Sequence, residues 1–171
     1  MNDTLYKTSD RELLKSIAGV DTGFHKPEVV LDGLTDEQAL MKQSGLPHSI
    51  ADIVAHMWYW QEFFNRAARE GFSGFPEHAD EGWPKVGPGE WEAVRDRFLA
   101  SVEATQGLAM TCGKLDDRLL PEGFPIPFWE RESLGSGLLH GAVHSAHHLG
   151  QVVLLRQLMG LWPPAAGSMT W

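Results

Sequence analysis

Apolar residues recur every three or four positions along three long stretches of the chain, and this spacing predicts amphipathic helices. The clearest stretch follows Ser49, a residue type that caps helix N-termini, and covers residues 50–70. Its apolar face, in which Gln61 is the one polar member, consists of Ile50, Ile53, Val54, Met57, Trp60, Gln61 and Phe64. The other two stretches run from about residue 90 to 112 and from about residue 131 to 159, where Gly160 suits the end of a helix.

Shorter helical segments are predicted in the N-terminal quarter of the chain. One covers residues 11–20 and can be capped by Ser9 or Asp10. Two more are expected over residues 27–34 and 35–43, and the second begins with the Thr-x-x-Gln pattern of a capping box. No stretch alternates between apolar and polar residues for long enough to predict a strand.

These elements predict an all-α fold, a four-helix bundle with long Gly/Pro-rich loops, in a single domain over residues 1–171. The longest connection, residues 71–90, holds five glycines and three prolines, which exclude a continuous helix. A loop of this length is often functional, as a lid or a pocket wall, but a tolerated surface insertion fits equally well. A second Pro-rich connection includes residues 121–129.

Composition excludes several classes of protein. The net charge of −9 makes nucleic acid a poor partner, since an acidic surface repels phosphates. No apolar run reaches the length of about 18 residues that a membrane span needs, and no secretory signal is visible at the N-terminus. Cys112 is the only cysteine, which excludes an internal disulfide and fits a reduced, cytoplasmic location. We therefore expect a cytoplasmic protein with neither a nucleic-acid nor a membrane partner.

The last long stretch carries an unusual cluster of histidines. Four of the eight histidines in the chain, His140, His144, His147 and His148, fall within nine residues. At about 100° per residue, they share an arc of roughly 100° with Gln151, on the face that would meet the bundle core. A buried polar group without a partner costs about 1–3 kcal/mol, so five such groups need a shared explanation.

Three explanations compete at this point. The imidazoles could form a structural cluster, hydrogen-bonded to one another and to Gln151. They could form a surface stripe that titrates near pH 6.5. They could also hold a metal ion, since two histidines at i and i+4 project side by side and reach one ion. Both His140 with His144 and His144 with His148 have this spacing.

A third ligand would have to come from another helix. His56 lies at the edge of the apolar face of the helix predicted over residues 50–70, where an unpaired imidazole would be costly. His48 precedes that helix and suits a cap or a pocket rim, whereas His25 and His78 look like ordinary loop residues. The HExxH pattern of zinc proteases is absent, because Ser145 stands at the position of its glutamate. The long helices also lack the Glu-x-x-His pairs of di-iron bundles.

Two segments together resemble the DinB-like (damage-inducible) superfamily: "SIADIVAHMWYWQ" at residues 49–61 and "HSAHHLGQVVLLRQLMG" at residues 144–160. Its members include metal-dependent hydrolases and bacterial thiol S-transferases, among them mycothiol-dependent maleylpyruvate isomerases. The resemblance extends from residue 31 to about residue 160. It implies a four-helix bundle, often a homodimer, in which three histidines hold a divalent metal ion.

The resemblance assigns the metal ligands to His56, His144 and His148. It gives His147 a supporting role. Loops 71–90 and 121–129 match no pattern of the family, so they are expected to shape the pocket and they leave the substrate open.

Three imidazole ligands leave a coordination position open, which is typical of catalytic sites. The ion, Zn²⁺ or Ni²⁺ by preference, could activate water or hold a low-molecular-weight thiol as its thiolate. The expected function is a metal-dependent hydrolase or thiol S-transferase. The alternative is a non-catalytic dimeric bundle with a structural or vestigial metal site, and a haem-binding bundle is a third, weaker interpretation.

Other residues are candidates for the surroundings of the ion. Gln151 and His147 could orient ligands or substrate, and His140 could be a pocket residue, an alternative ligand or plain core. Asp52 is either an orienting residue or an exposed acid, and Arg156 either binds an anionic group or is solvated or ion-paired. An apolar pocket could be lined by tryptophans, namely Trp58, Trp60, Trp83 and Trp129.

Overall fold

The computed structural model describes residues 9–19, 25–71, 74–117, 133–165 and 167. Its helices are α1 (Asp10–Ala18), α2 (Pro27–Leu31), α3 (Asp36–Leu40), α4 (Ile50–Glu70), α5 (Trp91–Thr111) and α6 (Leu134–Leu158), with a 3₁₀ helix η1 (Ala79–Gly82). No strand occurs within these ranges, so the prediction of an all-α fold is confirmed. The residues of loop 121–129, Trp129 included, lie outside the described part of the chain.

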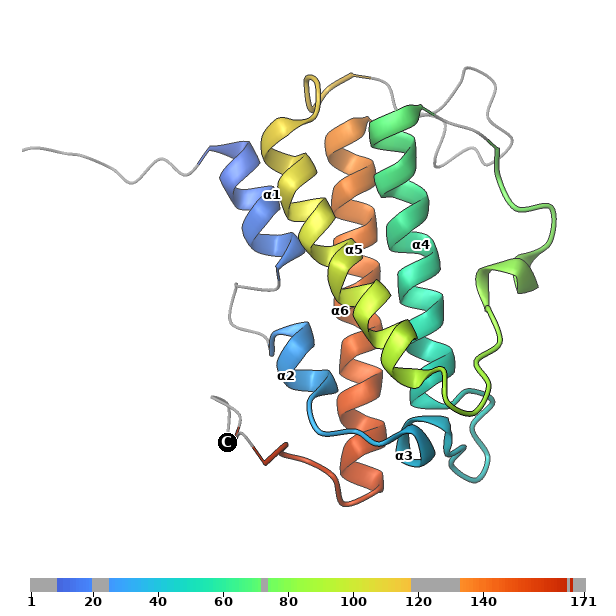
Figure 1. Cartoon of the computed structure of the whole chain (residues 1–171). Coiled ribbons are helices and arrows are strands. Elements are labelled where there is room, and N and C mark those ends of the chain that lie inside the picture. The colour runs from blue at the N-terminus through green and yellow to red at the C-terminus, as the bar shows by residue number, and fades with distance from the viewer. Residues whose placement is uncertain (1–8, 20–24, 72–73, 118–132, 166, 168–171) are drawn as a thin grey trace, which may run out of the picture.

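Helices α4, α5 and α6 run side by side along the length of the molecule (Figure 1). Helix α4 packs against both α5 and α6, and α1 packs against α5 and α6. Helix α1 has only nine residues, and the short α2 contacts the same two long helices. The first helix expected for a four-helix bundle is therefore shared between α1 and α2, which lie one below the other in Figure 1.

Local hydrogen bonds explain where the helices begin. The hydroxyls of Ser9, Thr35 and Ser49 each accept a bond from the backbone N–H three residues later, as predicted. Helix α6 begins in the same way, because Ser133 caps it through the N–H of Ser136. This cap lies a few residues after the predicted start near residue 131.

Asp52 completes the cap of α4, and this role differs from both roles expected for it. Its carboxylate accepts a bond of 2.9 Å from the backbone N–H of Ser49 and lies 3.4 Å from Nζ of Lys42. Partial burial raises the pKa of Asp52, but the hydrogen bonds from Ser49 and the charge of Lys42 outweigh it and leave the pKa below its usual value. Asp52 therefore stabilises the start of the helix that carries His56.

Arg156 is a structural residue, neither an anion-binding group nor a solvated one. Its side chain is buried, and its guanidinium donates to the backbone carbonyls of Val30 and Leu161. It also lies over the ring of Trp162, 5.6 Å from the ring centroid. These contacts fasten α2 and the segment after α6 to the end of α6.

The main core lies between α4, α5 and α6. Its largest fully buried side chains include Trp91, Phe98, Ile50 and Met57. Trp91 satisfies its indole N–H by donating to the carbonyl of Leu34, 3.0 Å away, so that burial leaves no donor unpaired. Among the described helices, none is long and apolar enough to cross a membrane.

Candidate metal centre

Helices α4 and α6 bring three histidines from distant parts of the chain together. His56 comes from α4, and His144 and His148 come from successive turns of α6. Nε2 of His144 lies 3.1 Å from Nε2 of His56 and 3.1 Å from Nε2 of His148. Each residue offers one ligand atom, and these atoms all lie within 4.8 Å of one another, so the group could hold a metal ion.

The outer nitrogens of two of these rings have defined partners. Nδ1 of His56 donates to the carbonyl oxygen of Gly82 at 2.6 Å, and Nδ1 of His148 donates to Oε1 of Gln151 at 2.7 Å. Since both oxygens can only accept, each Nδ1 carries the proton. In a neutral imidazole the Nε2 atom then holds a lone pair, so His56 and His148 both present acceptors to His144.

His144 cannot satisfy both neighbours. A proton on its Nε2 can serve one of the two contacts, and its buried Nδ1 has no hydrogen-bond partner among the described residues. A proton on Nδ1 instead leaves three lone pairs facing one another. A cation that accepts all three lone pairs removes the conflict, and zinc–nitrogen bonds of about 2.0–2.1 Å would place the nitrogens about 3.3–3.4 Å apart. The residues therefore fit a metal ion better than the structural cluster considered from sequence.

The rings are kept neutral by their surroundings. The loss of hydration on burial, followed by repulsion from nearby histidines, lowers the pKa of His144 to about 3. Burial also lowers the pKa of His56 to about 4, although the bond to the Gly82 carbonyl opposes this shift. The pKa of His148 is lowered for the same reason. His56 and His148 are buried and His144 is half-buried, and burial lowers the pKa of all three, so the surface-stripe interpretation does not apply to them.

Two further residues extend the cluster toward solvent. The Gln151 side chain, which holds Nδ1 of His148 through its carbonyl, donates its amide N–H to Nε2 of the exposed His147 at 3.2 Å. This chain of contacts places both residues where supporting groups were expected. His140 instead packs its ring against Phe64, with centroids 5.1 Å apart, and it is not part of the three-histidine group.

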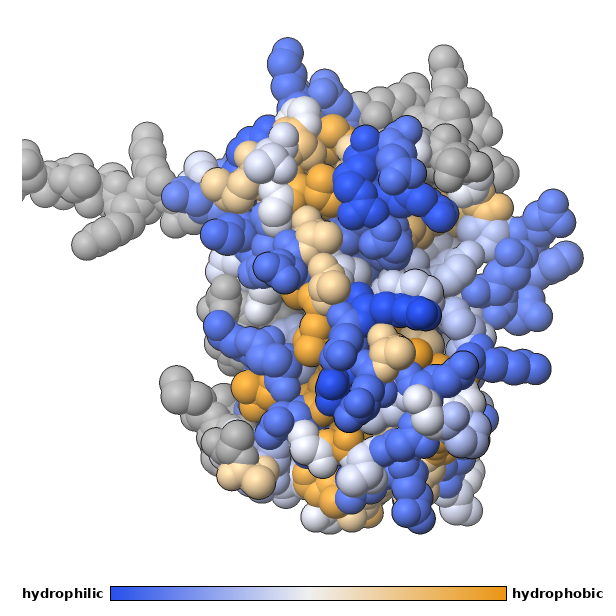
Figure 2. Space-filling view, viewed as in Figure 1, coloured by the Kyte–Doolittle hydropathy of each residue, from blue (hydrophilic) through white to orange (hydrophobic). Residues whose placement is uncertain are grey.

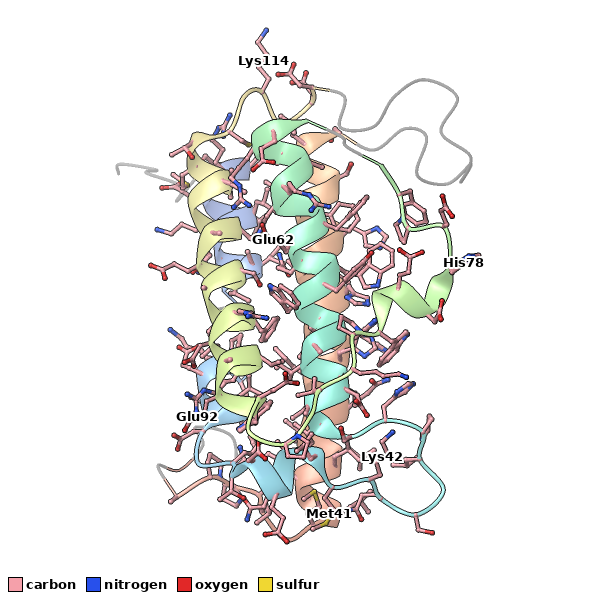
Figure 3. All side chains as sticks on the ribbon, turned by 45° about the vertical axis from the view of Figure 1, so that its right-hand side comes forward. Met41, Lys42, Glu62, His78, Glu92 and Lys114 are labelled. Carbon is pink, nitrogen blue, oxygen red and sulfur yellow. The ribbon has the colours of Figure 1, made fainter. Side chains whose placement is uncertain are left out.

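Segment 74–90 forms a wall of the site. Of the two roles considered for loop 71–90, a pocket wall and a tolerated surface insertion, the first applies to this part of the loop. The ring of Trp83 lies between His56 and His48, at centroid distances of 3.7 and 3.8 Å, and is nearly parallel to both. In Figure 3 ring side chains gather between α4 and this segment, whereas His78 lies on its outer side.

Gly82 is a residue that sequence reasoning missed. Its carbonyl orients His56, and a Cβ atom at this position would lie 2.9 Å from Nε1 of Trp60. Only glycine therefore lets the segment approach α4 closely enough for the carbonyl to reach Nδ1 of His56. The sequence signal for this close approach of the loop to α4 was a glycine directly before a tryptophan.

A pocket of about 410 Å³ opens beside the histidines. Its lining consists of Leu46, Pro47, His48, Ile53, Trp83, His148, Gln151, Leu154 and Leu155. Of the tryptophans expected to line a pocket, Trp83 does so. Trp60 packs instead against Gly82, Phe63 and Phe75. Trp58 lines a separate pocket of about 150 Å³, where it lies beneath the guanidinium of Arg97.

Comparison with known proteins agrees with these observations. The family model of the DinB superfamily matches residues 25–152, a range that contains all three histidines of the cluster. No curated protein and no solved structure is significantly similar to the chain. Because the family model covers most of the sequence, the chain belongs to the DinB superfamily.

Proposed function

We propose that the protein is a metal-dependent enzyme of the hydrolase or thiol S-transferase type. Its divalent ion, Zn²⁺ or Ni²⁺ by preference, would be held by His56, His144 and His148. The observation that carries the proposal is the meeting of three neutral imidazoles whose Nε2 atoms cannot satisfy one another. Three such ligands leave a coordination position open, as catalytic zinc sites do.

When bound, such an ion acts as a Lewis acid and lowers the pKa of water or of a thiol in its open position. The chain supplies the orientation. Gly82 and Gln151 hold the Nδ1 protons of two ligands and direct their Nε2 atoms inward. Trp83 covers one face of His56 and excludes water from it. A small-molecule substrate, and a low-molecular-weight thiol where one takes part, would reach the site through the adjoining pocket.

The active form would be a homodimer. Helix α6 leaves four large apolar side chains exposed at helical spacing, namely Leu139, Val143, Leu154 and Leu158. The face formed by α5 and its neighbours is largely hydrophilic, with apolar residues in a narrow central strip and in smaller patches beside it (Figure 2). A two-fold interface through the first half of α6 would bury Leu139 and Val143 and leave Leu154, which lines the pocket, accessible to the substrate. Val143→Asp is then expected to yield monomers in sedimentation experiments, while a monomeric wild-type protein would contradict this part of the proposal.

Metal analysis of protein purified without a histidine tag tests the main proposal. About one equivalent of a divalent ion per chain is expected after reconstitution. A metal content near zero would contradict it. His56→Ala then separates an enzyme from a bundle with a purely structural ion. Loss of esterase, amidase or thiol-adduct activity supports the enzyme, whereas a lower melting temperature in a protein with no such activity supports the alternative.

A further inference from the structure

The pocket beside the three histidines has an unusual lining for a site that would bind a divalent ion. None of its nine lining residues, all within the described part of the chain, is Lys, Arg, Asp or Glu. Five are aliphatic or proline side chains: Leu46, Pro47, Ile53, Leu154 and Leu155. The polar groups of the lining are those of His48, Gln151 and His148 and the indole N–H of Trp83, and Gln151 and His148 already bond to each other.

The cations that neighbour the lining residues in sequence lie or bond elsewhere, and Lys85, two residues after Trp83, lines a separate pocket. Arg156 follows Leu155 in sequence, but its guanidinium donates to the carbonyls of Val30 and Leu161. Lys42, labelled in Figure 3, is paired with Asp52 at 3.4 Å. A carboxylate or phosphate in the body of the pocket would therefore lose its hydration without gaining a charged partner.

The aromatic ring of the lining also has little surface to offer. Both faces of Trp83 are covered, one by His48 and the other by His56, at 3.7–3.8 Å between centroids. Only the edge of the indole remains for a ligand, so an aromatic ligand cannot stack on a face of Trp83. Apart from neutral hydrogen bonds to His48 or to the indole N–H, aliphatic contacts with the leucines are the remaining source of affinity.

We infer that the substrate of this site is a molecule with one metal-directed polar group and an uncharged aliphatic body. The inference rests on the proposed function and names its substrate class. The polar group would lie at the three histidines, and the alkyl or acyl body would fill the pocket lined by Leu46, Ile53 and Leu154. Di-acids and other substrates with a second anionic group would be excluded.

The test uses cobalt(II)-loaded wild-type protein and three hydroxamate probes, with the visible spectrum of the cobalt as the readout. The probes are acetohydroxamate, octanohydroxamate and the octanohydroxamate analogue that ends in a carboxylate. The dissociation constant is expected to fall about fourfold for each methylene that enters the pocket. The terminal carboxylate is expected to abolish most of this gain.

The outcomes distinguish the two proposals. If cobalt binds and acetohydroxamate changes the spectrum, but chain length has no effect or the carboxylate strengthens binding, the substrate class is wrong and the metal site stands. If cobalt does not bind, both proposals fail.

A charge introduced at the rim provides an independent test. Leu46 lines the pocket and Met110 does not, yet both side chains are 42% exposed, so neither substitution disturbs the core. Leu46→Lys is expected to strengthen binding of the carboxylate probe about tenfold relative to octanohydroxamate. Met110→Lys should leave this ratio unchanged. Equal ratios in the two variants would overturn the inference.

Discussion

The molecule buries two groups of polar side chains around α4, and they are satisfied in opposite ways. The amide–hydroxyl cluster links α4 to α5 and α6 and comprises Gln61, Asn65, Ser101, Thr105 and Ser145. Within it donors and acceptors alternate: the Ser145 hydroxyl donates to the Gln61 carbonyl at 2.9 Å, and the Gln61 amide donates to Thr105. Thr105 then donates to Asn65 at 2.7 Å, whose amide donates to the Ser101 carbonyl at 2.8 Å.

The three-histidine cluster, His56, His144 and His148, has no such alternation. Two of its rings direct their only protons outward, to Gly82 and Gln151, so that their inner nitrogens are acceptors. Amides and hydroxyls carry both donors and acceptors and can close a network among themselves. Burial of polar groups therefore does not by itself indicate a functional site. A buried cluster in which hydrogen-bond acceptors outnumber the donors available to them does indicate one.

The largest expected effect follows from removing the central imidazole. The His144→Ala variant should bind Zn²⁺ more than about a hundredfold more weakly than the wild-type protein. Loss of a group that merely hydrogen-bonds to a metal ligand already lowers metal affinity about 10- to 100-fold, and His144 is itself a proposed ligand. In wild-type protein, Zn²⁺ at a thousand times its dissociation constant should add about 4 kcal/mol to the free energy of unfolding. A chelator competition titration and thermal unfolding with and without metal measure both effects. The control is His140→Ala, one turn away against Phe64, and equal losses in the two variants would contradict the assignment.

The Gly82 carbonyl oxygen, which accepts the hydrogen bond from Nδ1 of His56, can be moved without replacing any of the proposed metal ligands. Gly82→Ala places a methyl group within 2.9 Å of Trp60 and should move the carbonyl away from Nδ1 of His56. We expect zinc affinity to fall about 10- to 100-fold. Gly87→Ala in the same segment is the control, because its Cβ would meet only the end of the Glu90 side chain at 3.4 Å. Unchanged affinity in Gly82→Ala would show that this carbonyl does not orient the ligand.

The amide–hydroxyl cluster should respond in stability and not in metal binding. Thr105→Val keeps the shape of the side chain but leaves the Gln61 amide N–H and the Asn65 carbonyl without their partner. We expect the free energy of unfolding of the metal-free protein to fall by about 2 kcal/mol in denaturant titrations. Zinc affinity should stay at the wild-type value. A variant with wild-type stability but weaker zinc binding would reverse the contrast between the two clusters.

The smallest effect is expected at Asp52, one turn before His56 and outside both clusters. Asp52→Ala should lower the stability at neutral pH by up to about 1 kcal/mol, because it removes the acceptor for the Ser49 backbone N–H. The pKa of Asp52 lies below 3.8 in the folded state, so its contribution is present above that pH and is lost as the pH falls through the folded pKa. Unfolding curves of both proteins should therefore converge in acid. If Asp52→Ala also lowered the zinc affinity, Asp52 would be a residue that orients a metal ligand and not only part of the helix cap.

Features that depend on neighbours within about one helical turn were predictable from the amino-acid sequence alone. The caps at Ser9, Thr35 and Ser49 were predictable because their hydrogen bonds span three residues. The periodicity of apolar residues predicted α4, α5 and α6 in the same way. Helical geometry also placed His144 and His148 on one face, since residues four apart are neighbours in any α-helix.

Contacts between groups far apart in the sequence depend on how the helices and loops pack. His56 and His144 are separated by 88 positions, Arg156 and Val30 by 126, and no local pattern predicts either contact. The same limit applies to Gly82, whose carbonyl reaches His56 only because a loop glycine lets the segment approach α4. Such contacts depend on how the helices pack and on where the loop crosses them. The sequence therefore identifies the histidines, whereas helix packing sets which Nε2 lone pairs face one another and directs the Nδ1 protons of His56 and His148 away from the cluster.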